Sequence, residues 1–526
     1  MKKIIYVFIA AALLSGGCKK FLEEQSQDEV RPSTFQHLNS LMSADGYPYQ
    51  SANNPNNRLT LMVDMISDDV QCNGGQGQKQ YELTARKGKA PYTWSKQMFE
   101  EVLLPGGLES KSNVDSWAVI YKRISGCNVV LSYADKVSGS QADRENLKGQ
   151  ALAMRGYYYF MLVNMFARPY NDPSSKPETS PGVPLRLSME VGDDFATRNT
   201  VAEVYNQIET DLKQAADLMK TYPPSSQSPY KMNVPAVYAL LSRVYLYQEK
   251  WDLAIDYASK GLAIKPTLSQ LSSFAAIGGY NKFNNDFSSG GAYLNRIYDV
   301  TRSKEVLWSY RPTDGGTSEW FKGNSTPDYS STYKPVYAPS SDLMNLYETR
   351  PLPDSTTYLA DLRPRLYFVY YGYINFSNFS VNFINVNGGM GGAGIRVAEL
   401  YLNRAEANIH KFIDSGNDAF RVAALSDINT LRMSRYDPRK PYVTINIADG
   451  NALLNYYKEE RRREFPFEEG HRWFDLRRYG MPSISHYYEE VVGTGQTYTL
   501  AQGDSRYTLP IPLEVLQRNG ELIQNP

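Results

Sequence analysis

Residue types that carry out covalent chemistry are present in this 526-residue chain, but they do not form a recognisable catalytic motif. No G-x-S-x-G elbow marks a nucleophilic serine, and the four histidines lack the paired spacing of zinc ligands. The two carboxylates of a glycoside hydrolase are defined only by their separation in space, so the 56 acidic residues do not identify such a pair. We therefore predict no catalytic residue, no metal site and no cofactor.

Two further motifs resemble binding sites but lack the necessary context. Gly389, Gly391 and Gly394 match the G-x-G-x-x-G pattern of dinucleotide-binding proteins, yet no βαβ rhythm surrounds them. Residues 64–69 hold three aspartates that lack the alternating spacing of a calcium loop. We interpret these aspartates as solvated loop carboxylates.

Aromatic rings beside amides and carboxylates indicate noncovalent binding, and sugars are the ligands they suit best. The apolar C–H faces of a sugar ring pack on flat aromatic side chains, while polar side chains bind the hydroxyl groups. One such cluster runs from Asn73 to Trp94, and a second from Tyr280 to Tyr337. The candidate ligand residues in these clusters are Asn73, Gln78, Tyr92, Trp94, Tyr298, Trp320 and Tyr329.

Packing is the alternative role for each of these rings, because a buried aromatic side chain can fill the space beneath a loop. Trp94 and Trp320 favour ligand contact, since their sequence neighbours are polar or small. Trp117, Trp251 and Trp473 instead lie on helical apolar stripes and are predicted to be core residues.

Composition narrows the possible partners and the redox chemistry. The 56 basic and 56 acidic residues balance, which argues against a nucleic acid as partner. Three cysteines are too few for a disulfide framework. Cys72 and Cys127 either pair in an oxidising compartment or remain two separate buried thiols, and the sequence leaves both alternatives open.

The N-terminal segment is typical of a secreted lipoprotein. A basic start (MKK) precedes an apolar run over residues 4–14, which is shorter than the roughly 20 residues that span a bilayer. The run leads into the sequence LSGGC at residues 14–18, which resembles a bacterial lipobox. We predict a signal peptide over residues 1–17 and a lipid on Cys18; an ordinary cleavage site with a chance cysteine is the alternative.

Helical periodicity predicts the scaffold that must hold the candidate loops. Apolar stripes run through residues 113–136 and 141–166, and a third helix follows Thr200, a preferred type of N-cap residue. One hairpin cannot bury its own faces, so we expect the helices at 113–166 and 395–435 to stack on a central hairpin at Val234–Pro266. That hairpin matches the tetratricopeptide template at Tyr238, Leu241, Ser242, Tyr245, Ala254 and Pro266.

Residues 268–387 lack this helical pattern, because glycine, serine, asparagine, proline and aromatic residues dominate them. Short strands are predicted at Val306–Tyr310 and around the alternating Phe379, Val381 and Phe383. A long irregular stretch is usually functional or disordered, and the aromatic content argues against disorder. Loops held by a rigid frame are where binding groups usually lie.

The most specific stretch of the chain is KEERRREFPFEEGHRWFDLRRY, at residues 458–479. A helix over residues 453–464 is stopped by Pro466. Gly470 allows the backbone angles of a turn, and a second short apolar face follows it. Acids interleave with the arginines, so a nucleic-acid patch is disfavoured. The spacing predicts ion pairs whose guanidinium groups also lie on aromatic rings, an arginine–aromatic clasp.

This spacing resembles the C-terminal signature of the SusD/RagB family of nutrient-binding surface lipoproteins. Other segments are similar to the same family: KKFLEE at residues 19–24, residues 147–170 with Arg155 followed by Tyr157–Phe160, and the C-terminal tail with Tyr507–Pro512 and Asn519–Pro526. The resemblance implies a mainly α-helical SusD-like fold over residues 18–526. Its tetratricopeptide-type scaffold would cover about 113–266 and 395–480, and its loop-rich ligand-binding part about 268–387, with a few short strands.

The resemblance also implies a function without covalent chemistry. The protein would be anchored by the lipid on Cys18 to the outer membrane, exposed on the cell surface, and would bind oligosaccharides or polysaccharides. It would pass them to a SusC-like TonB-dependent transporter. Uptake of peptides or another nutrient by the same mechanism is the first alternative, and a surface glycoside hydrolase is the second.

Overall fold

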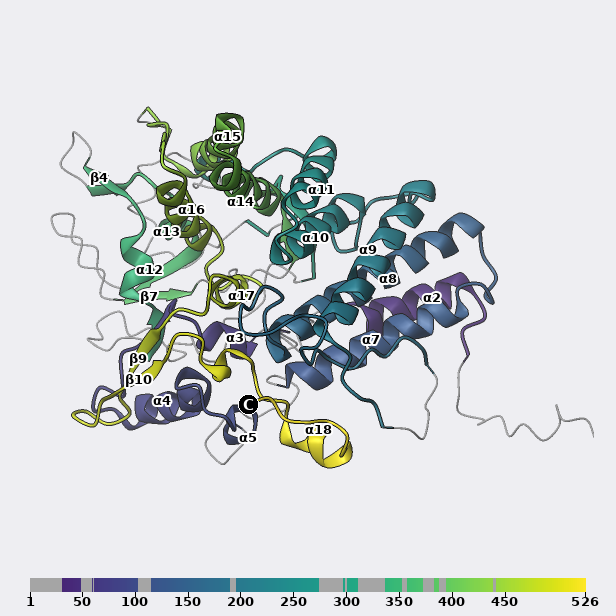
Figure 1. Ribbon diagram of the computed structural model, residues 1–526, viewed down its shortest axis with the longest axis horizontal. Helices are drawn as coiled ribbons and strands as arrows, with labels where there is room; N and C mark the ends of the chain where they lie inside the picture. The colour runs from purple at the N-terminus through teal and green to yellow at the C-terminus, as the bar shows by residue number, and fades with distance from the viewer. Residues whose placement is uncertain are drawn as a thin grey trace, which may run out of the picture.

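The computed structural model describes residues 31–48, 59, 61–102, 115–189, 195–273, 297–298, 300–310, 336–351, 357–371, 383–386, 394–438 and 441–526 (Figure 1). The predicted signal segment with Cys18 lies outside these residues, as do the candidate ligand residues Trp320 and Tyr329. Residues 387–393 and residues 372–382 also lie outside them. Helices dominate the described part, which confirms the predicted mainly α fold class.

Long helices form the scaffold: α7 (Ser116–Tyr133), α8 (Gln141–Phe166), α9 (Val201–Thr221), α10 (Val234–Tyr247), α11 (Trp251–Ile264), α14 (Val397–Ser415), α15 (Asp418–Arg435) and α16 (Gly450–Glu464). Shorter helices surround it: α2 (Phe35–Leu41), α3 (Leu61–Met65), α4 (Lys79–Tyr92), α5 (Met98–Glu101), α12 (Ser341–Asn345), α13 (Arg363–Tyr367), α17 (His471–Arg478) and α18 (Leu513–Arg518). None of the helices in the described residues has the length and apolar character needed to cross a membrane.

Side-chain caps begin the scaffold helices where the chain offers short polar residues. Thr200 Oγ1 accepts a hydrogen bond from Glu203 N at 3.2 Å, and Glu203 Oε2 accepts one from Thr200 N at 2.9 Å. This reciprocal capping box satisfies two backbone donors and confirms the N-cap predicted at Thr200. Ser140 caps α8 and Asn233 caps α10, each through one backbone N–H.

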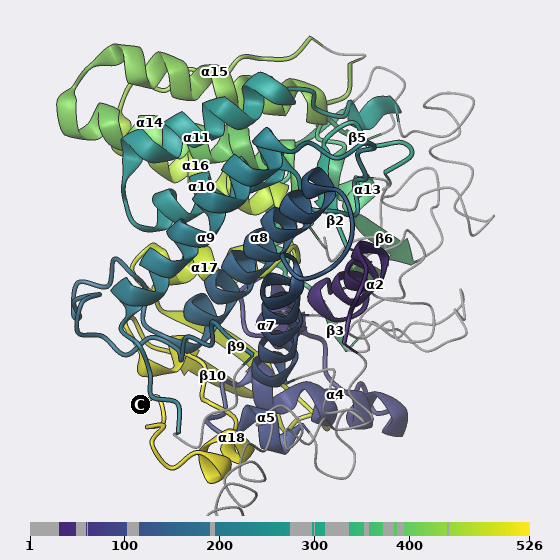
Figure 2. The same cartoon turned by 90° about the vertical axis from the view of Figure 1, so that its right-hand side faces the viewer.

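The scaffold helices pack in chain order, so that each contacts the helix before it and the helix after it. Figure 1 shows α7 through α11 and then α14 and α15 following one another across the molecule, and Figure 2 shows the same order from the side. The predicted stacking on the α10–α11 hairpin is confirmed for α14–α15. On the other side α9 is the main neighbour, because it lies between α8 and α10.

Small residues allow these helices to pack closely against one another. A Cβ atom on Gly261 of α11 would lie 2.8 Å from Leu400 Cδ2 of α14. Ser242, the small residue of the repeat template, is fully buried and accepts a hydrogen bond from Asn403 Nδ2 at 2.8 Å. A larger side chain at either position would force α11 or α10 away from α14.

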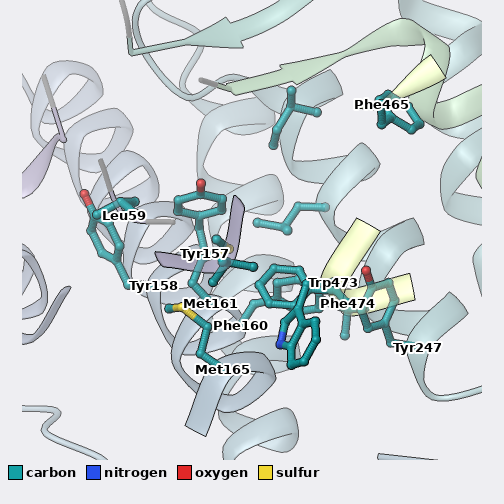
Figure 3. Packing of buried hydrophobic residues seen from close by; sticks show 14 of the residues in the cluster. Leu59, Tyr157, Tyr158, Phe160, Met161, Met165, Tyr247, Phe465, Trp473 and Phe474 are labelled. Atoms are coloured by element: carbon teal, nitrogen blue, oxygen red, sulfur yellow. The ribbon is translucent and has the colours of Figure 1, made fainter. Parts of the chain in front are cut away.

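Helix α8 runs through the middle of the molecule and is buried on every side from Gly149 to its end. A helix that is enclosed all round belongs to the core. Its residues Phe160, Met161 and Met165 lie in the same buried cluster as Trp473 and Phe474 of α17 (Figure 3). Arg155, a charged residue on this helix, is neutralised by Asp211 of α9 through two hydrogen bonds of 2.8 and 2.7 Å.

The strands are short and pair as two-stranded antiparallel sheets in the described residues. The pairs are β1 (Val70–Cys72) with β3 (Tyr337–Pro339), β2 (Val306–Ser309) with β8 (Gly394–Arg396), β4 (Thr349–Pro351) with β5 (Thr357–Leu359), β6 (Phe368–Tyr371) with β7 (Phe383–Val386), and β9 (Ile484–Tyr488) with β10 (Gln496–Leu500). Strand β2 confirms the strand predicted at Val306–Tyr310. Pairs such as Val70 with Pro339 join segments that lie far apart in the chain.

Helices α16 and α17 meet at the tight turn that Pro466 and Gly470 predict. Helix α16 ends at Glu464, and Gly470 has a left-handed backbone with φ of 71° just before α17 begins. Phe467 and Glu469 also have positive φ, 53° and 51°. This conformation is uncommon for residues with a Cβ atom, so the buried surroundings of the turn must enforce it.

The predicted arginine–aromatic clasp is confirmed. The guanidinium carbon of Arg396 lies 4.5 Å from the centroid of the Phe465 ring, and that of Arg461 lies 5.2 Å from the same centroid. The guanidinium carbon of Arg478 lies 4.2 Å from the centroid of the Tyr479 ring. These rings cover the arginines while acidic residues neutralise them, as buried guanidinium groups require.

Glu464, the last residue of α16, is at the centre of a buried ionic network. It accepts hydrogen bonds from Arg363 at 3.0 Å, from Arg435 at 2.8 Å and from Arg396. Glu305 accepts from Arg396 and Arg435 at 3.0 Å each. Burial alone would raise the pKa of Glu464, but the three guanidinium groups lower it to about 2. The carboxylate is therefore ionised and fully paired.

Asp68 and Asp69 are bound by the clasp, so their interpretation as solvated carboxylates was wrong. Arg472 donates to both carboxylate oxygens of Asp68 at 2.7 Å, and Arg462 donates to Asp69 Oδ1 at 2.7 Å. Burial opposes ionisation of Asp68, yet Arg472 lowers its pKa to about 2. These pairs tie the segment before β1 to α16 and α17.

Cys72 and Cys127 are both buried and both free, so the alternative of two separate thiols holds. Cys127 lies on α7 in the core and is fully buried. Burial disfavours a thiolate and raises the pKa of Cys127 to about 12. We therefore expect both thiols to be unreactive in the folded protein.

Candidate functional site

The loop between β1 and α4 carries the candidate ligand residues Asn73 and Gln78. Gly74, Gln76 and Gly77 all have positive φ, between 52° and 74°, so the loop folds back on itself. Asn73 and Gln78 are both partly exposed, and Asn73 Oδ1 accepts a hydrogen bond from Gln71 Nε2 at 3.0 Å. The loop thus holds polar side chains at the surface on a fixed backbone.

The β9–β10 hairpin packs directly against this loop. A Cβ atom on Gly75 would lie only 2.1 Å from the carbonyl oxygen of Glu490, so glycine is required for the contact. Arg86 of α4 donates from Nε to Glu490 Oε1 at 2.8 Å. Figure 1 shows β9, β10 and α4 side by side. We call the partly exposed face formed by Asn73, Gln76–Gln78, Tyr81, Tyr487 and Glu489–Val492 the loop–hairpin surface.

Tyr487 is the exposed aromatic ring of the loop–hairpin surface, with 51% of the residue accessible to solvent. Its hydroxyl group donates to Glu489 Oε1 at 3.3 Å, and that oxygen also accepts from Gly493 N at 2.9 Å. Val491 and Val492 continue the apolar part of the surface at the hairpin tip. An accessible ring beside fixed carboxylates and amides can stack on a sugar ring and bind its hydroxyl groups.

Tyr92 and Trp94 lie beneath this surface and not on it, because each is only 1% exposed. Both rings stack on the imidazole ring of His486, with centroid separations of 4.2 Å each. Trp94 Nε1 donates to the carbonyl oxygen of Ile66 at 2.9 Å, and Tyr92 donates to that of Tyr487 at 3.3 Å. The packing alternative describes both rings, since protein atoms fill the space that a sugar would need.

His486 fixes the position of β9 relative to α4. Its Nδ1 lies 2.6 Å from the carbonyl oxygen of Tyr92, and its Nε2 lies 3.1 Å from that of Ser67. Burial lowers the pKa of His486, while the two carbonyl oxygens favour its protonated form. The imidazole therefore links three segments under the loop–hairpin surface.

The structure brings the two predicted aromatic clusters together at Asn73. Asn73 N donates to the carbonyl oxygen of Val336 at 2.7 Å, and Cys72 is paired with Tyr337 across β1 and β3. Tyr337 belongs to the second cluster; its ring lies 5.2 Å from that of Tyr92 in the first. Val336, the first described residue after Trp320 and Tyr329 in the chain, therefore lies beside the loop that carries Asn73, while both candidates lie outside the described residues.

Tyr298, another candidate ligand residue, is buried with 7% exposure. Its hydroxyl group donates to Glu468 Oε1 at 2.5 Å and lies 3.4 Å from the carbonyl oxygen of Gly394. Glu468 also accepts from Arg396 at 2.8 Å. Tyr298 thus attaches its segment to the clasp, and its ring packs in the core.

The ionic network anchors the segments from which the irregular loops extend. Glu305 directly precedes β2, which leads to residue 310, and Arg396 is the last residue of β8, the strand that directly follows residues 387–393. Because Arg396 binds both Glu305 and Glu464, it fixes the ends of two loops to α16. A rigid frame of this kind keeps loop-borne binding groups in place.

A separate hollow of about 510 Å³ lies where α11 faces the end of α14. Trp251, predicted to be a core residue, is only partly buried and lines this hollow with Lys411 and Asp414. Its ring stacks on His410 with a centroid separation of 4.2 Å. The core prediction holds for Trp117 and Trp473, which are 5% and 0% exposed.

Sequence reasoning missed Tyr487 and Glu489 as surface groups. The alternation of β9, with buried Ile484, His486 and Tyr488, is the signal that places Tyr487 on the outer face. The sequence analysis predicts no strand at residues 484–488, so it does not assign Tyr487 to an outer face.

Stacked helices, short two-stranded sheets and a buried ionic network make up the described part of the chain. Residues 20–246 match a family model described as starch-binding and associating with the outer membrane (SusD-like), and residues 355–526 match the model of the SusD family, SusD_RagB. The chain belongs to the SusD/RagB family. No curated protein matches the chain.

Solved structures with the same fold cover almost the whole chain. A putative sugar binding protein from Bacteroides vulgatus has a TM-score of 0.63 and 23% identity over 95% of this chain and 99% of its own. A SusD superfamily protein from Bacteroides thetaiotaomicron has a TM-score of 0.62 and 20% identity over 94% of this chain and 100% of its own. A SusD-like carbohydrate binding protein from Bacteroides vulgatus has a TM-score of 0.57 and 20% identity, with coverage of 93% and 97%.

Proposed function

We propose that this protein binds oligosaccharides or polysaccharides at the cell surface and delivers them to a SusC-like TonB-dependent transporter in the outer membrane. The loop–hairpin surface carries the proposal, because it holds an exposed tyrosine between fixed carboxylates and amides. The family description of starch binding and outer-membrane association supports it. Cys18 would carry the lipid that anchors the protein, and residues 18–526 would act as one unit.

Ligand contact would be made by Asn73, Gln78 and Tyr487 together with Trp320 and Tyr329 from the segment that ends beside Asn73. The hydrogen bond from Asn73 N to Val336 supports this grouping, since it joins the two segments. Tyr92, Trp94 and Tyr298 would position these groups from below. Binding alone, without bond cleavage, is the task that such an arrangement performs.

A glycan array followed by calorimetry with the best ligand tests the proposal directly. We expect binding of a glycan class without release of reducing ends on prolonged incubation. Binding of peptides in place of glycans would indicate uptake of another nutrient, and steady release of reducing ends would indicate a surface glycoside hydrolase. Either result would overturn the proposed function.

Of the two tryptophans predicted to bind ligand, we expect Trp320 to contact the ligand and Trp94 to stabilise the core. Trp320→Ala should weaken glycan binding about tenfold, roughly 1.4 kcal/mol, with little change in melting temperature. Trp94→Ala should instead remove a packed core ring and destabilise the fold by about 3–5 kcal/mol. Calorimetry and thermal unfolding of both variants distinguish these roles; a large stability loss for Trp320→Ala with binding intact would make Trp320 a packing residue.

Tyr487→Ala is expected to lower glycan affinity about fivefold to tenfold, because it removes the exposed ring of the loop–hairpin surface and about 1 kcal/mol of stacking. The melting temperature should change little, since half of this residue is accessible to solvent. Phe195→Ala is the matched control, because Phe195 is 59% exposed and lies outside the loop–hairpin surface. Equal affinity losses in the two variants would contradict a ligand role for Tyr487.

A further inference from the structure

A cavity of about 240 Å³ lies where α8 begins, α9 ends and α10 begins. None of the residues that line it belongs to α4, to β9 or to the loop–hairpin surface, so the cavity is distinct from that surface. None of its lining residues is acidic, whereas Lys220 and Lys231 are basic. The cavity therefore carries positive charge that its own lining does not balance.

Lys231 is a half-buried cation without a carboxylate partner among the described residues. Its ammonium group donates to Asn39 Oδ1 of α2 at 2.7 Å, the single hydrogen bond found for it there. An ammonium group has three donors, so two are left for a ligand. Burial lowers the pKa of Lys231, because no nearby anion stabilises the charge. A bound anion would supply that missing counter-charge.

The polar wall of the cavity is held in a fixed arrangement by buried amides. Gln150 donates to Asn146 Oδ1 at 2.7 Å and accepts from the hydroxyl group of Tyr47 at 2.8 Å. Asn146 donates to the carbonyl oxygen of Tyr222 at 2.7 Å, and Tyr47 accepts from Met232 N at 2.9 Å. Gln150 and Asn146 are 6% and 5% exposed. The wall is thus preformed, and the lysines supply its free donors.

The rest of the lining is partly polar, with Ser226, Gln227, Ser228 and Asn233, and partly apolar. The apolar part comes from Met219, Met232, Val234, Ile264 and the prolines at 223, 224 and 235. The volume is below the roughly 300–1,000 Å³ of pockets for drug-sized ligands, which limits the occupant to a compact molecule. Such a lining would bind the apolar face of the molecule while the lysines bind its charged group.

We propose that this cavity binds a small organic carboxylate with an apolar face, held through ion pairs to Lys231 and Lys220. Free uronic acids and short aromatic acids are two classes of compound that combine a carboxylate with an apolar face. The inference stands on the charge and shape of the cavity, and it does not rest on the proposed glycan function of the loop–hairpin surface.

Calorimetry with matched acid and neutral probes tests the inference. Glucuronate against glucose, and benzoate against benzyl alcohol, separate the two sources while isolating the charge. We expect at least one acid to bind at least tenfold more tightly than its neutral counterpart, and to bind more weakly as salt is raised. Equal binding within both pairs, binding of neither acid, or equally tight binding of inorganic phosphate would overturn the proposal.

Lys231→Met should lower the affinity for the bound acid at least tenfold. Lys265→Met is the matched control, because Lys265 is also half-buried with a lowered pKa, donates to the carbonyl oxygen of Val306 at 2.6 Å, and does not line the cavity. If Lys231→Met lowers the melting temperature, the exposed Lys220→Met gives a second test, with an expected loss of severalfold. Unchanged affinity in both cavity variants would refute the assignment.

Discussion

Glu464→Gln is expected to destabilise the protein by about 3–5 kcal/mol or more, because it leaves three buried guanidinium groups without their shared counter-charge. The glutamine side chain has nearly the same shape, so the loss reports charge and not volume. Its amide group would also place a donor against Arg396 or Arg435. Urea unfolding followed by circular dichroism measures the difference in the free energy of unfolding.

Glu459→Gln is the matched control for this change. Glu459 lies on the same helix, its side chain is 54% exposed, and it forms one ion pair of 3.6 Å with Arg463. An exposed pair of this kind contributes less than about 1 kcal/mol. Similar losses in the two variants would show that the buried network does not hold the fold together in the way we infer.

Glu469→Gln is expected to remove a pH dependence of stability between about pH 5 and pH 7. Glu469 is buried and accepts hydrogen bonds from Tyr310 at 2.8 Å, from Gly394 N at 3.1 Å and from Tyr157. Burial raises its pKa from 4.5 to about 7, although the two tyrosine hydroxyl groups favour the carboxylate. Arg243 lowers and Glu468 raises this pKa as well.

The sign of the effect follows from proton binding. Between the unfolded pKa of 4.5 and the folded pKa of about 7, the folded state holds a proton on Glu469 that the unfolded state has lost. The contribution of Glu469 is therefore fully present below pH 4.5 and is lost as the pH rises to about 7. The pKa difference corresponds to about 3 kcal/mol.

Thermal or urea unfolding of wild type and Glu469→Gln across pH 4–8 checks this expectation. The variant keeps a neutral group at every pH, so it should gain stability relative to wild type as the pH rises through the window. Groups shared by both proteins cancel in the difference. Parallel stability curves for the two proteins would rule out a protonated Glu469 in the folded state.

Glu464 provides the opposite dependence within the same protein. Its folded pKa is lowered from 4.5 to about 2, so its contribution is present above pH 4.5 and is lost as the pH falls towards 2. The two neighbouring carboxylates differ because arginines surround Glu464, whereas tyrosine hydroxyl groups and a backbone N–H surround Glu469.

Local sequence signals predicted most of the helical frame. The capping box at Thr200, the stripe of α8, and the break between α16 and α17 at Pro466 and Gly470 each depend on residues within a few positions of one another. Such features are set by backbone conformation and by i to i+4 contacts, which a sequence pattern records directly.

The candidate site was predicted less well, because side-chain exposure depends on residues far away in the chain. Trp94 and Tyr92 stand in a polar stretch, yet His486 from the C-terminal hairpin packs between them. Asp68 has polar neighbours, yet Arg472, 404 positions later, neutralises it. Tyr487 became the exposed ring only through the pairing of β9 with β10 and the contact of that hairpin with Gly75.

The sequence by itself determined the mainly helical class, the family and the arginine–aromatic clasp. Periodicity and residue spacing involve residues close together in the chain, so they can be recognised without the tertiary structure. Tertiary structure alone decided which rings are buried, which carboxylates meet arginines and which lysines lack partners. These outcomes depend on contacts between distant segments, where burial and charge pairing are resolved together.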